Sequence, residues 1–382
     1  MLKKIISLLL ISSMLLICSP SVVADEEGET LPVDPVDAVI ESLDPYSYGG
    51  VYVENGQTYI SAVNTESLSR ELSSELAKNR STGLHIAETT VEYSYGELLD
   101  AQERIIQSME NENTYEIYET YVGQKDNIVA VGSPEWTEDK KQGVSELSGL
   151  DLAHLSFYII TEEDIENEFF PEEAGEELTI IDERATTVTP KPGSKIVCNG
   201  KTMSLCTPVV WSVGSSTKGG FLTCAHTEDK TGKAIYDGSN HLIGYGDLWD
   251  YGGYYDSTLI ERSSNDIKGT FVLPDGKKIQ ASRAPKEGET IYRYGQHHLT
   301  PVSGKVISTD STVIHSGTGV RITGFKTDAS VVGGDSGGPI MTNSSTGNYA
   351  LVGLNSTTNY GARIDKVLSK YNAKLSTVFP SK

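Results

Sequence analysis

Cysteine is scarce in this chain, with four residues in 382, and one of them, Cys18, lies in the apolar N-terminal run. The other three, Cys198, Cys206 and Cys224, allow at most one intrachain disulfide. The sequence also lacks a His-Glu-x-x-His motif and the paired cysteine spacing of zinc sites, so it predicts no metal site and no cofactor. Phosphate-binding loops and stripes of basic residues are missing too, so we expect no nucleic-acid partner.

Long apolar runs are confined to the start of the chain. Two lysines precede an apolar run that ends at Cys18, and small residues follow as far as Ala24. This layout predicts a secretory signal peptide over residues 1–24. The alternative, a lipid-attachment site at Cys18, is disfavoured by the bulky Ile17 before it. Because no later segment has the roughly 20 apolar residues that span a bilayer, we expect a secreted, extracellular protein with no membrane contact after signal removal.

Basic residues are few in the first half of the chain. Residues 25–190 contain 38 acidic and 8 basic residues, whereas residues 191–382 contain 15 and 21. Between them, residues 186–195 hold two prolines, a glycine and small polar residues, which is linker composition. We therefore predict an acidic domain over 25–185, a linker or processing region, and a second domain over 196–382. Opposite charge favours docking of one domain on the other; an ordinary solvated acidic surface is the alternative.

The acidic domain is predicted to fold. Ser94 and Glu97 have capping-box spacing ahead of a helical pattern, and a second helix is expected over residues 66–79. Strand-like runs cover residues 51–53, 58–62, 115–122, 128–131 and 155–161. The sequence therefore predicts a compact α+β domain, with residues 162–177 as an exposed acidic tail.

The second domain has a different pattern. From residue 196 onward, short apolar runs alternate with Gly, Asn and Asp turns. This spacing predicts an all-β barrel or sandwich. Only residues 365–376 have a helical pattern.

Residues 331–340, Val-Val-Gly-Gly-Asp-Ser-Gly-Gly-Pro-Ile, surround one hydroxyl with four glycines. A turn between two strands is the simple interpretation. A nucleophilic serine would need the same residues, because glycines let a substrate carbonyl approach the backbone and let N–H groups point at a developing negative charge. On this interpretation Ser336 attacks, and the N–H groups of Gly334 and Ser336 form an oxyanion hole.

A serine nucleophile needs a base and a group that orients the base. His226 ends a short apolar strand in Gly-Phe-Leu-Thr-Cys-Ala-His, where an imidazole can be half exposed yet held in place. Asp256 opens an apolar strand after aromatic residues, while Asp247 and Asp250 are rivals in a looser, glycine-rich context. A surface histidine and a turn-capping aspartate are the alternatives for these positions.

The order of His226, Asp256 and Ser336, within Thr-x-Ala-His and Gly-Gly-Asp-Ser-Gly-Gly-Pro, resembles the chymotrypsin-fold serine proteases. Among them the chain is most similar to secreted bacterial enzymes of the streptogrisin and α-lytic protease type. The resemblance implies two six-stranded antiparallel β-barrels of trypsin-like fold, preceded here by an α+β pro-domain. It also implies that Asp335 is structural and forms an ion pair with the buried Arg293.

The same resemblance implies a primary substrate pocket that includes Ser330, Ser356 and Thr358. Ser330 stands where trypsin-like members have an aspartate, so a preference for Lys or Arg is not expected, and both medium apolar and acidic side chains stay open. The relatives' cysteine after the catalytic histidine is missing here. Cys206 and Cys224 flank the first hairpin at similar distances from its turn, and we predict a disulfide between them.

Together these features predict a secreted serine endopeptidase made as a zymogen, with protein or peptide substrates and its own pro-domain as partners. The alternative is a catalytically inactive homologue that serves as an extracellular binding module. An esterase with the same triad is a further alternative. An α/β-hydrolase is disfavoured because both partner residues precede the serine in the chain.

Overall fold

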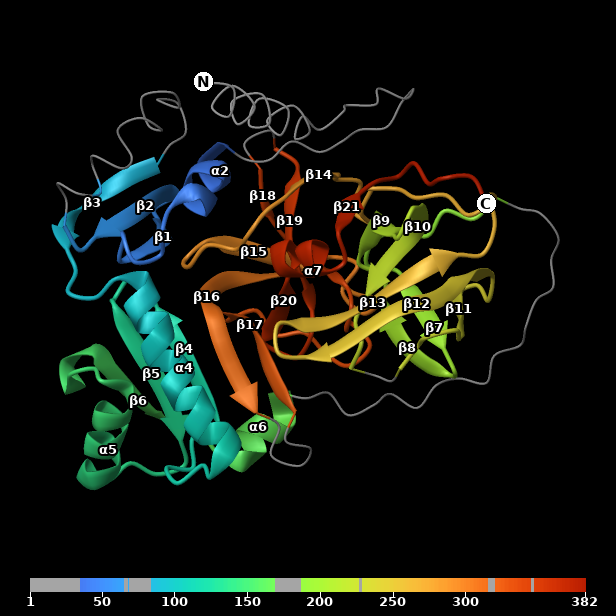
Figure 1. Ribbon diagram of the computed structural model, residues 1–382. Helices are drawn as coiled ribbons and strands as arrows, with labels where there is room; N and C mark the ends of the chain where they lie inside the picture. The colour runs from blue at the N-terminus through green and yellow to red at the C-terminus, as the bar shows by residue number, and fades with distance from the viewer. Residues whose placement is uncertain are drawn as a thin grey trace, which may run out of the picture.

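The computed structural model describes residues 35–64, 68, 84–168, 187–226, 229–314, 320–344 and 347–382. The predicted signal peptide, most of the predicted helix over 66–79 and residues 169–186 lie outside these ranges. In Figure 1 the N-terminal region lies beside one β-structure, coloured orange to red, and a second, green to yellow, lies on the other side of it.

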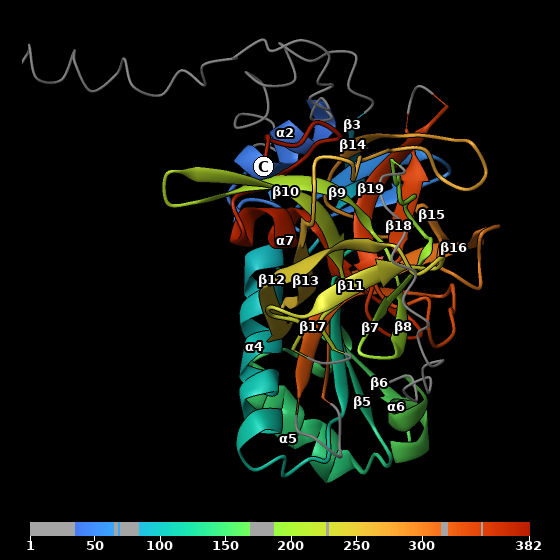
Figure 2. The ribbon, with the colours of Figure 1, turned by 90° about the vertical axis from the view of Figure 1, so that its right-hand side faces the viewer.

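The N-terminal region combines short strands with four helices in its described part. Its helices are α2 (Pro35–Ser42), α4 (Tyr95–Asn111), α5 (Glu138–Ser148) and α6 (Glu162–Glu168), with a 3₁₀ turn at Leu152–His154. Its strands are β1 (Gly50–Glu54), β2 (Gln57–Ala62), β3 (Leu84–Thr90), β4 (Glu119–Gly123), β5 (Ile128–Ser133) and β6 (Leu155–Ile159). The two views place β1–β3 with α2 at one end of this region and α5 with α6 at the other (Figure 2).

Local signals in this region fold as the sequence predicts. The Ser94 hydroxyl accepts a hydrogen bond from the Glu97 N–H, and the Glu97 carboxylate accepts one from the Ser94 N–H, so the capping box begins α4. Asn55 and Gly56 both have positive φ, 50° and 77°, which is the turn that joins β1 to β2. The buried side of α4, including Leu98 and Ile105, packs with β4 and β5 in one apolar cluster.

The first sheet of the C-terminal domain holds eight strands. They are β7 (Lys195–Cys198), β8 (Lys201–Ser204), β9 (Thr207–Val213), β10 (Ser216–Thr223), β11 (Ala234–Asp237), β12 (Leu242–Gly252), β13 (Tyr255–Arg262) and β21 (Ala373–Leu375). The order is β21-β9-β10-β13-β12-β11-β7-β8, with antiparallel neighbours throughout. The last strand, β21, follows the helix α7 (Ile364–Lys370) and so carries the end of the chain back to this first sheet.

The second sheet contains a closed ring. Its strands are β14 (Ile279–Ser282), β15 (Thr290–Arg293), β16 (Val302–Ile314), β17 (Arg321–Thr327), β18 (Pro339–Asn343), β19 (Tyr349–Asn355) and β20 (Tyr360–Arg363). The ring runs β15-β18-β19-β20-β17-β16 and closes because β16 also pairs with β15. The predicted fold class, an all-β domain after an α+β region, is confirmed. The second sheet contains one six-stranded barrel as predicted, whereas the first sheet has eight strands instead of six.

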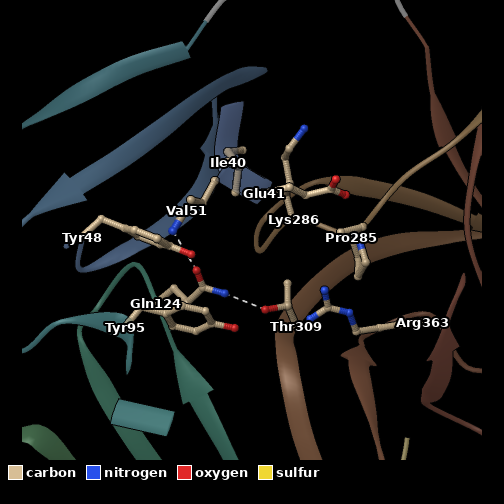
Figure 3. Close-up of a pocket in the computed structure, with 11 residues that line it drawn as sticks. Ile40, Glu41, Tyr48, Val51, Tyr95, Gln124, Pro285, Lys286, Thr309 and Arg363 are labelled. Carbon is tan, nitrogen blue, oxygen red and sulfur yellow. Dashed lines mark hydrogen bonds between the residues drawn. The ribbon is translucent and has the colours of Figure 1, made fainter. Parts of the chain in front are cut away.

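The N-terminal region extends this second sheet. Strand β4 pairs antiparallel with the edge of β16, and β5 and β6 continue the sheet beyond it. Next to this joint, Gln124 donates to the Thr309 hydroxyl across a small pocket that residues of both regions line (Figure 3). Strand pairing through the main chain therefore joins the two regions into one sheet.

The predicted Cys206–Cys224 disulfide is wrong: the structure forms no such bond. Both thiols lie fully buried in the apolar core of the first sheet. Burial raises the pKa of both, that of Cys224 to about 12, so each side chain packs as a small neutral group.

Candidate active site

Ser336 lies in the loop between β17 and β18, in the seam between the two sheets. Ser204 of β8 anchors this loop from the first sheet, because its N–H donates to the Ser336 carbonyl at 2.7 Å and its hydroxyl to the Gly334 carbonyl at 2.8 Å. Asn355 of β19 anchors it from the second sheet by accepting from the Gly337 N–H at 2.8 Å. The nucleophile candidate is thus held from both sides.

Two glycines of the loop have conformations that other residues rarely adopt. Gly334 and Gly337 both have φ of 83°. A Cβ on Gly337 would also lie 2.3 Å from the Thr223 hydroxyl and 2.5 Å from the Ser204 carbonyl. The glycines therefore allow the sharp turn and the close contact with the first sheet that bring Ser336 into the seam.

His226 is positioned by Asp256. One carboxylate oxygen of Asp256 accepts from the N–H groups of Ala225 and His226, at 2.7 and 2.9 Å. The other oxygen lies 2.8 Å from Nδ1 of the His226 ring. Trp249 fixes the same turn by donating to the Ala225 carbonyl at 3.0 Å. The backbone and the ring of residue 226 are both set by one carboxylate.

The other side of the ring reaches the serine. Nε2 of His226 lies 2.9 Å from Oγ of Ser336, although the two residues are 110 positions apart in the sequence. The three predicted residues thus form one hydrogen-bonded chain from Asp256 through His226 to Ser336. The two rival aspartates are engaged elsewhere, since Asp247 forms an ion pair with Lys218 and Asp250 forms one with Lys370.

The electrostatics of Asp256 suit an ionised carboxylate. The side chain is 2% exposed. Burial by itself raises its pKa, but electrostatic attraction to the His226 imidazole and the hydrogen bonds from His226, Ser356 and Ala225 outweigh this, so the net pKa is lowered. A buried carboxylate that stays ionised can stabilise a positively charged imidazole.

The predicted Asp335–Arg293 ion pair is wrong. Asp335 is fully buried, and its carboxylate instead pairs with Nδ1 of His298 and accepts from the His297 N–H. The N–H groups of Arg293 donate hydrogen bonds to uncharged oxygens. These belong to Asn355, Thr327, Ala329, Thr357, Thr358 and Tyr360. Sequence reasoning missed His298, whose only signal was its place in the polar turn Gly-Gln-His-His.

The three predicted pocket residues have different surroundings. Ser356 is 1% exposed and donates to the Asp256 carboxylate, so it helps to hold the carboxylate that contacts His226. Ser330 donates to the Asn359 side chain at 2.7 Å, and Thr358 lies next to Asn359 in the chain. The segment 357–359 also contacts the end of α6: the Thr358 N–H donates to the Glu168 carbonyl at 3.0 Å. The prediction of an exposed acidic tail over 162–177 is therefore wrong at Glu168, because this residue contacts the segment 357–359.

Among the residues with described positions, no group of three or more His, Cys, Asp or Glu side chains could hold a metal ion. In that same part of the chain no helix is long and apolar enough to cross a membrane.

Three solved structures of bacterial proteases are similar to part of this chain. Similar structures are a Cellulomonas bogoriensis chymotrypsin (18% identity, TM-score 0.40, 50% of this chain and 100% of that chain) and Thermobifida fusca protease A (22%, 0.40, 50% and 100%). A Nocardiopsis protease is similar at 18% identity and TM-score 0.40, over 49% of this chain and 99% of its own. No model of a protein family and no curated protein matches the sequence. The structural neighbours of this chain are bacterial chymotrypsin-fold serine proteases, which cover about half of it.

Proposed function

We propose that the chain is a secreted serine endopeptidase made as a zymogen, with residues 1–24 as signal peptide and 25–185 as pro-region. The observation that carries the proposal is the chain of contacts from Asp256 through His226 to Ser336, at 2.8 and 2.9 Å. The substrates are proteins or peptides, and the processing cut falls between residues 182 and 195.

The geometry supports the following chemistry. Neutral His226 donates from Nδ1 to Asp256 and accepts the Ser336 proton at Nε2 while Oγ bonds to the peptide carbonyl carbon. The N–H groups of Gly334 and Ser336 take the charge that develops on the carbonyl oxygen. The His226 proton then moves to the leaving nitrogen as the C–N bond breaks. Water, deprotonated by His226, hydrolyses the ester on Ser336 and restores the enzyme.

A fluorophosphonate probe tests this function on the processed protein. Only a serine activated by a base reacts rapidly, so we expect one covalent adduct, located on Ser336 by peptide mass spectrometry. Casein should be cleaved by the same preparation and a panel of simple esters more slowly. Absence of an adduct would favour the binding-module alternative, and ester cleavage without casein cleavage would favour an esterase.

As pro-region, residues 25–185 act as inhibitor and folding aid for the protease. Their docking supports this: β4 pairs with β16, and acidic side chains contact basic ones of the second sheet. Glu103 and Glu110 of α4 lie 3.4 and 3.2 Å from Arg321. Glu119 of β4, 1% exposed, pairs with Lys326. Opposite charge at the contact matches the uneven charge of the two halves of the chain.

Lys326→Met is expected to loosen this docking. The change leaves the buried Glu119 carboxylate with the Tyr360 hydroxyl but without a cation. Losing one member of a buried pair costs about 3–5 kcal/mol, and because Lys326 is 21% exposed we expect the lower end, about 3 kcal/mol. In thermal unfolding of the full chain, with Ser336→Ala added to prevent self-cleavage, the midpoint temperature of the first transition should be lower. Lys326→Arg keeps the charge and should change it little; equal effects of both substitutions would contradict the explanation.

A further inference from the structure

Glu168 is the last residue of α6, and its side chain contacts residues 357–359, the segment that follows Ser356. Both of its carboxylate oxygens are held: one accepts from the Asn359 side-chain amide at 2.6 Å, and the other from the Asn359 N–H at 3.1 Å and the Thr357 hydroxyl at 3.3 Å. All three groups act as donors here. This arrangement fits a carboxylate and not a neutral amide, whose NH₂ would face the N–H donors of Asn359.

The main chain of α6 pairs with the same segment. The Thr358 N–H donates to the Glu168 carbonyl at 3.0 Å, and the Thr358 hydroxyl donates to the Asn167 carbonyl at 3.0 Å. Ser356, two residues before Thr358, donates to the triad carboxylate of Asp256. The main-chain carbonyl and the side-chain carboxylate of Glu168 therefore both accept hydrogen bonds from residues 357–359, the segment directly after Ser356, which contacts Asp256.

A buried cation lies behind this segment. Arg293 is fully buried and donates to the carbonyl oxygens of Thr357 and Thr358 at 2.8 and 2.6 Å. Its hydrogen bonds go to neutral oxygens, while Asp335 is paired with His298. Burial lowers the pKa of Arg293 to about 9, and the nearby carboxylates of Glu168 and Asp335 both oppose this shift. A guanidinium in a low-dielectric setting favours a negative side chain on the outer side of the segment.

We propose that Thr357 and Asn359, with Arg293 behind them, form a substrate subsite for a glutamate side chain, which Glu168 occupies in the unprocessed chain. The inference rests on the proposed protease function, because it names a selectivity of that same site. Once processing removes Glu168, the donors of Thr357 and Asn359 bind the carboxylate of an incoming peptide. Acidic peptides are then the preferred substrates.

The test compares peptides with Glu, Gln, Leu or Lys at each position before the cleaved bond. A hydrogen bond to a charged group supports about 10- to 100-fold discrimination, so we expect Glu to exceed Gln by that factor in kcat/KM at one position. Asn359→Leu and Thr357→Val should each reduce the ratio toward one. Asn343→Leu, a matched change at an exposed strand end, should leave it unchanged. No position with a preference for Glu, or a preference that both variants retain, overturns the subsite.

A binding assay separates this inference from the proposed function. Ser336→Ala protein that an added unrelated protease has cut in the linker, and that has been separated from the pro-region, is titrated with fluorescent peptides that contain Glu or Gln. We expect tighter binding of the Glu peptide by about tenfold or more. If the Ser336→Ala protein binds the Glu peptide selectively but the wild-type protein cleaves no peptide, the subsite stands and the protease function is overturned. Cleavage without selectivity keeps the protease function and overturns the subsite. Neither cleavage nor selective binding overturns both.

Discussion

Replacing Ser336 by alanine is expected to lower kcat for peptide cleavage by about a millionfold. Oγ of Ser336 is the atom that would bond to the substrate carbon, and it lies 2.9 Å from Nε2 of His226, the proposed base. When a triad serine is lost, the remaining rate over water comes from the oxyanion hole and from substrate binding alone. Cleavage of an internally quenched peptide, followed over hours for the variant and seconds for the wild type, gives the ratio.

Two precautions make this result specific. The variant is processed in trans by a trace of active enzyme that is then removed, so that retained pro-region does not account for lost activity. Ser239→Ala, the same change on an exposed turn, should keep activity within about twofold. A Ser336→Ala protein that retains more than about a hundredth of the wild-type rate would show that another group performs the attack.

The double variant His226→Ala, Ser336→Ala should have a kcat only slightly below that of either single variant. Residues that act in one proton transfer lose their benefit together, so their effects on kcat do not add. The single contact between Nε2 and Oγ is the physical basis of this expectation.

The sequence predicted the contacts that come from local motifs. Glycines around Ser336 and small residues before His226 are needed because the main chain packs closely against its neighbours there. A short stretch of sequence is enough to recognise such a pattern. The hairpin at Asn55 and the capping box at Ser94 could be predicted for the same reason: their partners lie within a few residues. The triad roles themselves stay predictions until they are tested.

Contacts between distant segments could not be predicted in this way. The sequence predicted Arg293 as the partner of Asp335, but the turn at residues 295–298 places His298 there instead. The contact is close, since a Cβ on Gly295 would lie 2.2 Å from the Asp335 carboxylate. The pairing of β4 with β16 could not be predicted, because its main-chain partners, such as Tyr121 and Ser311, lie far apart in the chain and no local motif links them. The docking of Glu168 was missed because a run of acids is usually solvated.

Asp256→Asn should lower kcat by about ten-thousandfold at neutral pH while leaving the fold intact. The carboxylate oxygen that accepts from the Ala225 and His226 N–H groups must stay an oxygen, so the new NH₂ takes the position of the other oxygen. There it faces Nδ1 of His226 as a donor. The ring must then carry its proton on Nε2, where it can no longer accept the proton of Ser336.

Asp247→Asn is the matched control, because Asp247 lies on the same sheet but contacts Lys218 and Trp211 instead of the histidine. It should keep kcat within a few-fold. The tautomer explanation makes one further demand on Asp256→Asn: KM should change little, because Asp256 contacts the base and not the substrate. A fall in kcat of less than tenfold would mean that His226 does not depend on this carboxylate for its orientation, and a large rise in KM alone would point to a distorted binding site.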